Sequence, residues 1–401
     1  MSAYRLFLIL CGVGAFAGNL AFTLNIVYQA QVVGLGPLQL VLVGTVMEAV
    51  AFFAQVPTGV IADVYSRRLS VVIGYVLMGL GLLLWGLVPT FAAILAANAV
   101  WAIGAVCVDG AQEAWAADEI GEDRIGRAFA RGGQIGQAGT VAGIVAAVVL
   151  ASLGLAVPIV AAGALTVLIG VGLAVFMPEN GWHRGEHPAT TMWSQVALGG
   201  RAVRTSPILI GLVAGTLFLG MSSEGFDRLS QPHFLVDLGF PGGLSPQVWF
   251  GVLAVAGAFG SMAVTGLLAR RIDALPAHRI GTLLAALQAV ASAGIIAFGL
   301  AGQFWPAVVA YLAVRLARDA AGPVMGAWMV ASTTSRSRAT VFSMQAQVDA
   351  LGQIAGGPPS GYAGQRLSIG VGILTSGLFI LPAVLLFAWA AGRTRPVPAE
   401  A

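Results

Sequence analysis

The stretch GVIADVYSRRLS, from Gly59 to Ser70, is a compact group of charges between two long apolar runs. The run before it contains one charged side chain, Glu48, and the run after it, to residue 88, contains none. A helix of about 20 apolar residues crosses a hydrocarbon layer roughly 30 Å thick at about 1.5 Å per residue. We therefore interpret this stretch as the polar turn between two membrane-spanning helices.

The same pattern continues along all 401 residues, of which 58% are hydrophobic and only 9% are charged. Soluble domains carry about 25% charged residues, and membrane barrel strands alternate polar and apolar positions, which these runs do not. We therefore expect an all-α integral membrane protein. Its twelve helices are predicted at roughly 4–31, 38–62, 69–88, 91–117, 128–153, 156–177, 207–235, 248–269, 280–301, 304–331, 340–364 and 367–391.

A polar stretch in the middle of the chain separates six of these helices from the other six. The predicted organisation is an N-terminal six-helix bundle at 1–178, a cytoplasmic linker at 179–206, a C-terminal six-helix bundle at 207–392 and a tail at 393–401. The first apolar run is too long for a cleaved signal peptide and lacks a small-residue cleavage site. We therefore interpret it as the first helix of the bundle.

The distribution of arginine predicts the orientation of the chain. All 20 basic residues are arginine, and a cytoplasmic N-terminus places sixteen of them on the cytoplasmic side and one, Arg366, outside. Basic residues that flank membrane helices stay in the cytoplasm, so both termini are predicted to be cytoplasmic. The absence of lysine, together with abundant alanine and glycine, favours a bacterial source. We expect a multi-pass protein of the bacterial cytoplasmic (inner) membrane.

Several classes of function are disfavoured by the residues that could carry them. Cys11 and Cys107 both lie within apolar runs, which leaves no disulfide framework or metal cluster. His183 and His187 have the i, i+4 spacing of metal ligands, but the nearby glycine and proline argue against a helix, so we expect no metal. No nucleophile triad or phosphate loop is present, and the arginines lie at helix ends, so we expect neither an enzyme nor a nucleic-acid-binding protein.

The Gly59 to Ser70 stretch resembles the cytoplasmic loop signature of the major facilitator superfamily, G-x-L-A-D-R-x-G-R-R/K. Gly59, Asp63, Arg67 and Arg68 match, together with an alanine, while position 66 is serine instead of glycine. The loop also lies in the expected place, directly after the second helix on the cytoplasmic side. The resemblance implies two six-helix bundles and a secondary transporter that works by alternating access without a cofactor, driven by a proton gradient.

The loop is predicted to form a cytoplasmic latch between the two halves. Gly59 allows close helix approach, and Asp63 could cap the positive N-terminus of the helix at 340–364. Arg67 or Arg68 could pair with an acid near the end of the helix at 91–117. Asp109 and Glu113 are predicted to share a face there, and the set of candidate latch residues is Gly59, Asp63, Arg67, Arg68, Asp109, Glu113 and Asp118. The alternative is an ordinary charged turn.

Two further strings resemble the third drug:proton antiporter family, which includes tetracycline and macrolide efflux proteins. They are DGAQEAWAADEIGEDRIGRAFARGGQ, from Asp109 to Gln134, and SSEGFDRLSQPHFL, from Ser222 to Leu235. The resemblance implies proton-coupled efflux of a lipophilic, drug-like small molecule, and we expect a monomer in the lipid bilayer. The rival interpretation is a major facilitator uptake, lipid or metabolite transporter, because a fold does not fix cargo or direction.

Ionisable side chains within predicted spans are candidates for proton coupling, since each is costly in a membrane. Glu48 and Asp349 lie near the expected bilayer midplane, where desolvation favours the protonated carboxylic acid. Arg315 and Asp319 are spaced to pair along one helix face, with Arg318 beside them. A neutralised structural pair is the alternative for these helix residues.

Two smaller groups complete the candidate site. Glu224 and Arg228 have the same i, i+4 spacing, with Asp227 beside them, toward the outer end of the helix at 207–235. They could form an outer gate or simply anchor the helix at the interface. The substrate cavity candidates share one face of the first helix, and helix packing is their alternative role. They are Asn19, Phe22 and Asn25.

Overall fold

The computed structural model describes residues 2–181, 203, 204, 206–333 and 335–393. Within this part of the chain, the side chains of residues 56, 57, 59–64, 122, 273, 335–337 and 339 are not described. The described residues fold into helices, without a strand, in twelve long helical segments. The all-α fold expected from the apolar runs is therefore confirmed.

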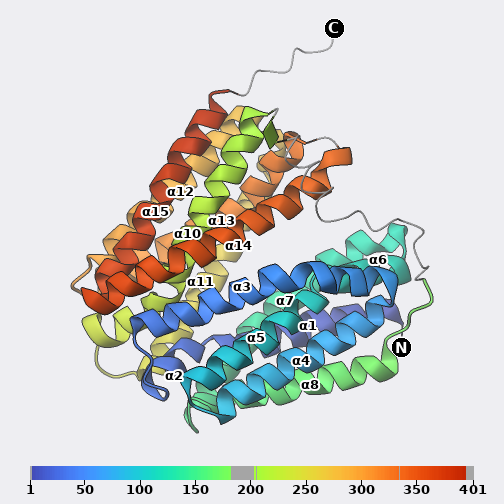
Figure 1. Ribbon diagram of the computed structural model, residues 1–401, viewed down its shortest axis with the longest axis horizontal. Coiled ribbons are helices and arrows are strands. Elements are labelled where there is room, and N and C mark those ends of the chain that lie inside the picture. The colour runs from blue at the N-terminus through green and yellow to red at the C-terminus, as the bar shows by residue number, and fades with distance from the viewer. Residues whose placement is uncertain (1, 182–202, 205, 334, 394–401) are drawn as a thin grey trace. The chain divides into compact units, whose positions relative to one another are not determined.

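The chain divides into two compact units (Figure 1), one formed by Met1–Ala189 with Gly243–Val255 and the other by Thr190–Gly242 with Ala256–Ala401. The first unit contains α1 (Ala3–Phe22), α2 (Asn25–Gln31), α3 (Pro37–Val64), α4 (Arg67–Leu87), α5 (Phe91–Val108), α6 (Ala111–Ile120), α7 (Glu122–Ala151) and α8 (Val157–Phe176). The second contains α10 (Pro207–Pro232), the π-helix η1 (His233–Leu238), the short η2 (Ile272–Ala274), α12 (Ala277–Gly299), α13 (Phe304–Ala331), α14 (Ser335–Arg366) and α15 (Ile369–Ala391). Helix α11 (Pro246–Ala269) contributes to both.

The two units repeat the same pattern of helix neighbours. In the first unit α1 packs against α7 and α8, while α4 packs against α5 and α8. In the second unit α10 packs against α14 and α15, while α12 packs against α13 and α15. Corresponding spans therefore occupy corresponding places in each unit, as in transporter folds that are built from structural repeats.

Two predicted helices are broken where the backbone leaves the helical conformation. The helix expected at 4–31 divides at residues 23 and 24, where Leu24 adopts a φ of −122° and a ψ of 11°. The helix expected at 91–117 ends at Val108 and resumes at Ala111, because Gly110 adopts a φ of 73°. The expectation that Asp109 and Glu113 share one helix face is therefore wrong.

Ten helical segments are long and apolar enough to cross a membrane, by length and composition within the described residues. The two remaining long helices are α13 and α14. Arg315, Arg318 and Asp319 lower the apolarity of α13, and α14 carries Asp349 among many polar residues. The two long helices that do not qualify as spans are thus ones that bear several of the candidate coupling residues.

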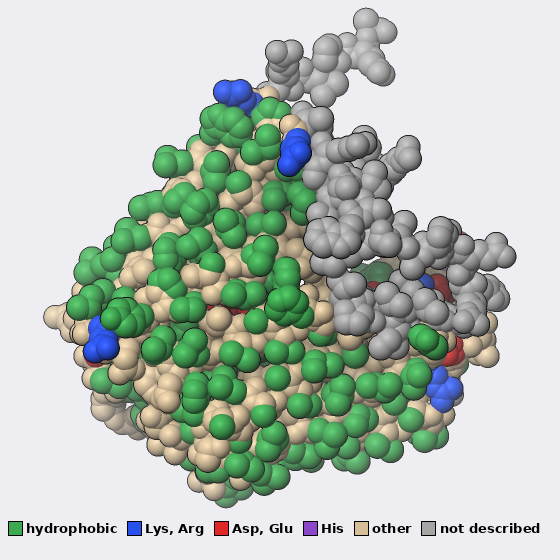
Figure 2. Space-filling model, viewed as in Figure 1, with side chains coloured by type: hydrophobic (Ala, Val, Ile, Leu, Met, Phe, Trp, Pro, Cys, Tyr) green, Lys and Arg blue, Asp and Glu red, His purple; other side chains and the backbone are tan. Residues whose placement is uncertain are grey.

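The surface has the apolar character that a lipid environment requires. Leu153 and Phe53 are each 75% exposed, and Leu385 is 71% exposed. Figure 2 shows hydrophobic side chains spread over the viewed face, with few charged side chains among them. Exposed apolar side chains on this scale would be unfavourable in water, so the surface supports membrane insertion.

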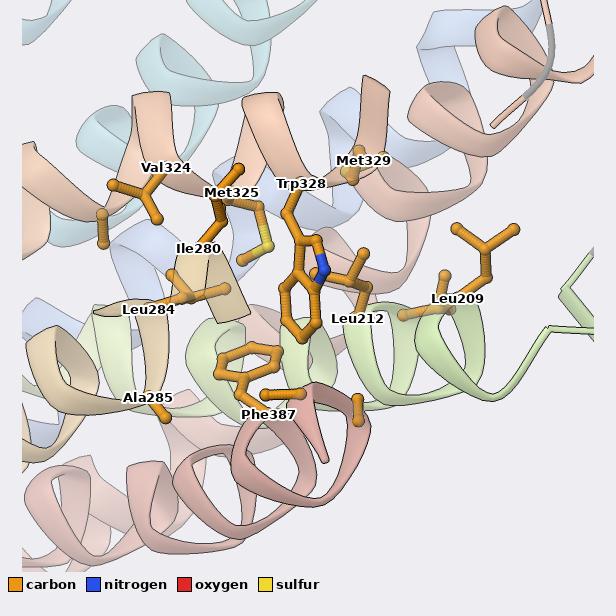
Figure 3. Packing of buried hydrophobic residues seen from close by; sticks show 14 of the residues in the cluster. Leu209, Leu212, Ile280, Leu284, Ala285, Val324, Met325, Trp328, Met329 and Phe387 are labelled. Atoms are coloured by element: carbon orange, nitrogen blue, oxygen red, sulfur yellow. The ribbon is translucent and has the colours of Figure 1, made fainter. Parts of the chain in front are cut away.

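Trp328 is at the centre of the packed core of the second unit. Its side chain is fully buried and meets the Phe387 ring edge-on, with ring centroids 6.4 Å apart (Figure 3). Leu212, Leu284 and Val324 are fully buried in the same cluster. Close packing supplies much of the stability of a helix bundle in lipid, because the hydrophobic effect between helices is weak there.

Glycines allow α10 and α14 to approach each other closely. A Cβ atom placed on Gly356 would clash with the backbone of Met221, and one on Gly352 would clash with the Leu217 carbonyl and approach the Gly220 Cα within 3.0 Å. Backbone atoms cannot move aside as flexible side chains can. The absence of a side chain at these positions therefore sets the distance between the two helices.

We expect Gly356→Val to destabilise the protein by about 1–3 kcal/mol, because the added side chain forces α10 and α14 apart. The measurement is the thermal unfolding midpoint in detergent. The control is Gly322→Val in α13, where a Cβ atom would meet nothing within 4 Å. Equal midpoints for the two variants would contradict the close-packing role of Gly356.

Candidate functional site

A bidentate ion pair connects two helices of the second unit. The Arg318 guanidinium on α13 donates from Nη1 to Asp227 Oδ1 at 2.6 Å and from Nη2 to Asp227 Oδ2 at 3.0 Å. The Arg318 guanidinium carbon also lies 5.8 Å from the centre of the Phe226 ring, in a cation–π arrangement. A planar guanidinium held by a carboxylate and an aromatic ring is fixed in direction as well as in charge.

A second ion pair lies within α10, and its side chains are more buried than those of the first pair. Arg228 Nε donates to Glu224 Oε2 at 3.2 Å, and the two side chains are only 10% and 6% exposed. The i, i+4 pairing implied by their spacing is therefore present. Such burial does not fit an anchor at the lipid interface, which was the alternative for Glu224 and Arg228. The outer-gate role remains a prediction.

The pairing expected on α13 is wrong. Asp319 accepts a hydrogen bond from Ser261 on α11, and no ion pair joins it to Arg315 among the described residues. Arg315 Nε is buried without a hydrogen-bond partner in the described part of the chain and lies beside Gly257. The carboxylate has an alternative partner on a neighbouring helix, which the spacing along α13 could not reveal.

Asp349 on α14 differs from the other acids of this group. Gln353 Nε2 donates to Asp349 Oδ2 at 2.8 Å, while no ion pair to Asp349 is found among the described residues. Arg318 is close enough to act on the carboxylate electrostatically, although it is bound to Asp227. Asp349 is thus a half-buried acid that a proton can neutralise without breaking an ion pair.

The charges in the interiors of α10, α13 and α14 do not balance. These interiors contain four acidic side chains and three arginines, so full ionisation leaves one negative charge in excess. Glu224 is buried and Asp349 is half-buried, whereas Asp227 and Asp319 are exposed. A carboxylate that is partly buried without an ion pair is costly, and protonation removes its charge. The members of this group, called the charge cluster below, are Glu224, Asp227, Arg228, Arg315, Arg318, Asp319 and Asp349.

The candidates in the first unit have other surroundings. Glu48 is half-buried in the middle of α3. Asn19 Nδ2 donates to the Thr140 hydroxyl on α7 at 3.2 Å, and Phe22 meets Trp101 edge-on with centroids 5.2 Å apart. Asn25 is only 5% exposed. The contacts of Asn19 and Phe22 fit their packing alternative, and their contact with substrate remains a prediction.

The charged loop forms one of its expected contacts. Arg67 makes an ion pair with Asp118 on α6 and donates to the Ala114 carbonyl at 2.9 Å. Arg68 instead donates to the Ala174 carbonyl at 2.5 Å on α8. Gly59 and Asp63 lie in the last turns of α3, but the Asp63 side chain and the surroundings of Gly59 are outside the described part of the structure. Asp109 and Glu113 are exposed.

Glu179, just after α8, holds this part of the chain to the charged loop, and the sequence did not single it out for this role. Glu179 accepts from the Ser66 hydroxyl at 2.7 Å and from the Arg68 backbone N–H at 3.0 Å. Ser66 also caps α4 by accepting from the Leu69 N–H. The replacement of a signature glycine by Ser66 was the available signal, because serine is a preferred N-cap residue. Residues 182–202 of the predicted linker, which include His183 and His187, are outside the described residues.

A further pair that was missed lies at the end of α10. His233 Nδ1 is 2.7 Å from Asp237 Oδ2, and His233 Nε2 is 3.1 Å from the Phe298 carbonyl oxygen on α12. The string from Ser222 to Leu235 drew attention to the acids and the arginine but not to this histidine. The i, i+4 spacing of His233 and Asp237 was the available signal.

Long apolar helices, two repeated units and ionisable side chains inside them define a class of protein, the polytopic membrane transporters. Residues 6–357 match the Major Facilitator Superfamily, and the chain belongs to this family. It is therefore a secondary transporter and not an enzyme. The chain is 24% identical over 362 residues to the uncharacterized MFS-type transporter YxaM of Bacillus subtilis (strain 168), covering 87% of this chain and 86% of that protein.

Solved structures of transporters share the fold. The nucleoside transporter NupG matches with a TM-score of 0.76 at 14% identity, over 98% of this chain and 100% of NupG. A bacterial homologue of the human lysosomal transporter Spinster, in an inward-facing conformation, matches with a TM-score of 0.74 at 17% identity, over 99% of this chain and 98% of the other. At such identities the likeness shows the fold alone.

Proposed function

We propose that this transporter couples the movement of protons to the efflux of a lipophilic, drug-like small molecule of tetracycline or macrolide type. The observation that carries the proton coupling is the charge cluster of the second unit, which contains four acids and three arginines. Ionisable groups within membrane spans are costly, and coupling to an ion is the common reason for keeping them.

Asp349 is the first proton carrier in this proposal. It has a hydrogen bond from Gln353 but no ion pair among the described residues, so proton binding there costs no charge pairing. Glu48 of the first unit is a second carrier candidate. A proton that enters from outside would favour one state of the alternating-access cycle, and release of that proton to the cytoplasm would reset it.

The direction and the cargo are supported by the resemblance of two strings to drug:proton antiporters. The charged loop is proposed as a latch in this cycle, with Arg67 and Asp118 as its paired members. The second candidate function is uptake of a polar solute. It is favoured by the fold likeness to transporters such as the nucleoside transporter NupG.

A binding screen separates these two functions. Purified protein is heated with tetracycline, erythromycin or ethidium, and in parallel with uridine or a dipeptide. A ligand of the native state raises the apparent unfolding temperature, with about 2.7 kcal/mol of stabilisation at a hundredfold excess over Kd. Stabilisation by the lipophilic set supports efflux, whereas stabilisation by uridine or the dipeptide alone would replace it with uptake.

We expect Asp349→Asn to reduce proton-driven transport of a bound compound to background, because asparagine keeps the shape of the side chain but cannot carry the proton. The measurement is accumulation in inverted vesicles after an imposed pH gradient. Exchange of labelled for unlabelled compound should continue, since it needs no net proton movement. The control is Asp123→Asn, at an exposed position in the first turn of α7. Full gradient-driven transport by Asp349→Asn would exclude Asp349 as the carrier.

A further inference from the structure

His233 joins the end of α10 to the end of α12. It is the first residue of η1, and it is only 3% exposed. Its ring contacts an acceptor oxygen at each nitrogen, since Asp237 Oδ2 is 2.7 Å from Nδ1 and the Phe298 carbonyl oxygen is 3.1 Å from Nε2. Phe298 is the residue before the last in α12, and its ring also meets the His233 ring edge-on at 5.0 Å.

The two contacts fix the number of protons on the ring. A neutral imidazole has one N–H donor and one lone pair, whereas a carbonyl oxygen and an ionised carboxylate can only accept. Both His233 nitrogens must therefore carry a proton for both hydrogen bonds to exist with an ionised Asp237. The Phe298 carbonyl belongs to the C-terminal end of α12, where the helix dipole favours a positive charge. With Asp237 ionised, the geometry describes a histidine cation between a carboxylate and a helix end.

The other charges around His233 do not explain this arrangement. The α15 helix, which packs against η1, contains no ionisable side chain. The ionisable residues of α12, His278 and Arg279, are in its first turn, at the opposite end from Phe298. On α10 Arg228 is paired with Glu224. From α13 the Tyr311 ring reaches Phe298, and the charged residues of that helix, Arg315, Arg318 and Asp319, belong to the charge cluster.

We propose that His233 and Asp237 form a proton-binding site whose proton holds η1 against the end of α12. The Asp237 side chain is 36% exposed, which gives a proton from water access to the pair. When the proton leaves, a neutral His233 ring has one donor for two acceptors, and one of its two hydrogen bonds is lost.

A chain of ring contacts leads from this site to the charge cluster. The Phe298 ring lies 5.8 Å from the Phe226 ring, and Arg318 lies over Phe226 at 5.8 Å. Loss of the His233 bond to the Phe298 carbonyl would therefore act, through the Phe298 ring, on Phe226. Phe226 in turn contacts Arg318, which pairs with Asp227. This effect on transport rests on the proton coupling proposed above, whereas proton binding by His233 does not.

The direct test is solid-state nuclear magnetic resonance of the full chain in lipid, with ¹⁵N-labelled histidine. The chain has four histidines, and His233→Gln identifies the signals of His233, with His278→Gln as the control. We expect the His233 ring to carry protons on both nitrogens in the unsubstituted protein. In Asp237→Asn the amide can donate to Nδ1, so the ring should carry one proton under the same conditions. A ring with one proton in the unsubstituted protein, or a ring that keeps both protons in Asp237→Asn, would overturn the proposal.

The transport arm uses the same variants in vesicles. His233→Gln and Asp237→Asn should lose the dependence of the transport rate on pH that the unsubstituted protein shows. His278→Gln, at an exposed position, should keep it. If the resonance result holds but no compound is moved by a pH gradient, the proposed function fails and the proton site stands. If gradient-driven transport is present with an unchanged pH profile in both variants, the switch role fails and the function stands.

Discussion

Arg228→Met is expected to destabilise the protein by about 3–5 kcal/mol, the cost of leaving one member of a buried ion pair without its partner. Glu224 is 6% exposed, and Arg228 Nε at 3.2 Å is its only ion-pair partner among the described residues. Methionine fills much of the arginine volume, so the loss measures the charge more than the packing. The measurement is thermal unfolding in detergent, which is monitored as the loss of the native peak in size-exclusion chromatography as temperature rises.

The double variant Glu224→Met with Arg228→Met is the matched control. Replacing both members of a buried pair by apolar side chains of similar volume is often neutral or even stabilising. We therefore expect the double variant to be more stable than Arg228→Met alone, although it carries one more substitution. A double variant that is as unstable as the single one, or less stable, would show that the arginine acts through packing and not through its charge.

Most of the fold could be predicted from the sequence because membrane spans are determined by length and apolarity. The apolar runs predict the helices that are long enough to span, and their polar ends mark the turns. The breaks in the first and fourth spans were missed for local reasons. Leu24 takes a φ of −122° and a ψ of 11°, and Gly110 takes a φ of 73°, and neither change of backbone conformation alters the apolarity of the run.

The candidate site was predictable only where partners lie on one helix. Spacing along the chain predicted the contact of Glu224 with Arg228, because both side chains face the same way one turn apart. It failed for Arg315 and Asp319, because Asp319 found Ser261 on another helix. Contacts between helices depend on how the helices pack against one another, and a single sequence does not reveal this packing. The replacement of the signature glycine by Ser66 is a similar case, because its acid partner lies 113 positions away.

The placement of the charged residues on particular helices indicates where function lies. The charges of the second unit lie on α10, α13 and α14, and α13 and α14 are also the helices that do not meet the apolarity expected of a span. A helix that departs from the composition favoured by lipid does so at a cost in stability. Proteins keep such departures mainly at sites where function requires them. The charge cluster is therefore the part of the molecule in which substitutions should separate transport from folding.

Arg318→Ala is expected to lower the transport rate roughly 10- to 100-fold, which corresponds to the loss of about 1.5–3 kcal/mol from hydrogen bonds to charged groups. Arg318 is the residue that joins α13 to Asp227 on α10, through hydrogen bonds of 2.6 and 3.0 Å. Its side chain is 32% exposed, so the fold should tolerate the change better than it tolerates Arg228→Met. The measurement is initial rate of transport in vesicles, corrected for the amount of protein inserted.

Two companion variants separate charge from geometry. Arg318→Lys keeps the positive charge but cannot make two parallel hydrogen bonds to Asp227, so an intermediate rate is expected. The exchange of Asp227→Arg with Arg318→Asp restores a bidentate pair in reverse and should recover part of the rate lost by either single change. If Arg318→Lys transports as fast as the unsubstituted protein, charge alone suffices at this position. If the exchange recovers nothing, the orientation of the pair toward Phe226 and the rest of the charge cluster matters as much as the pair itself.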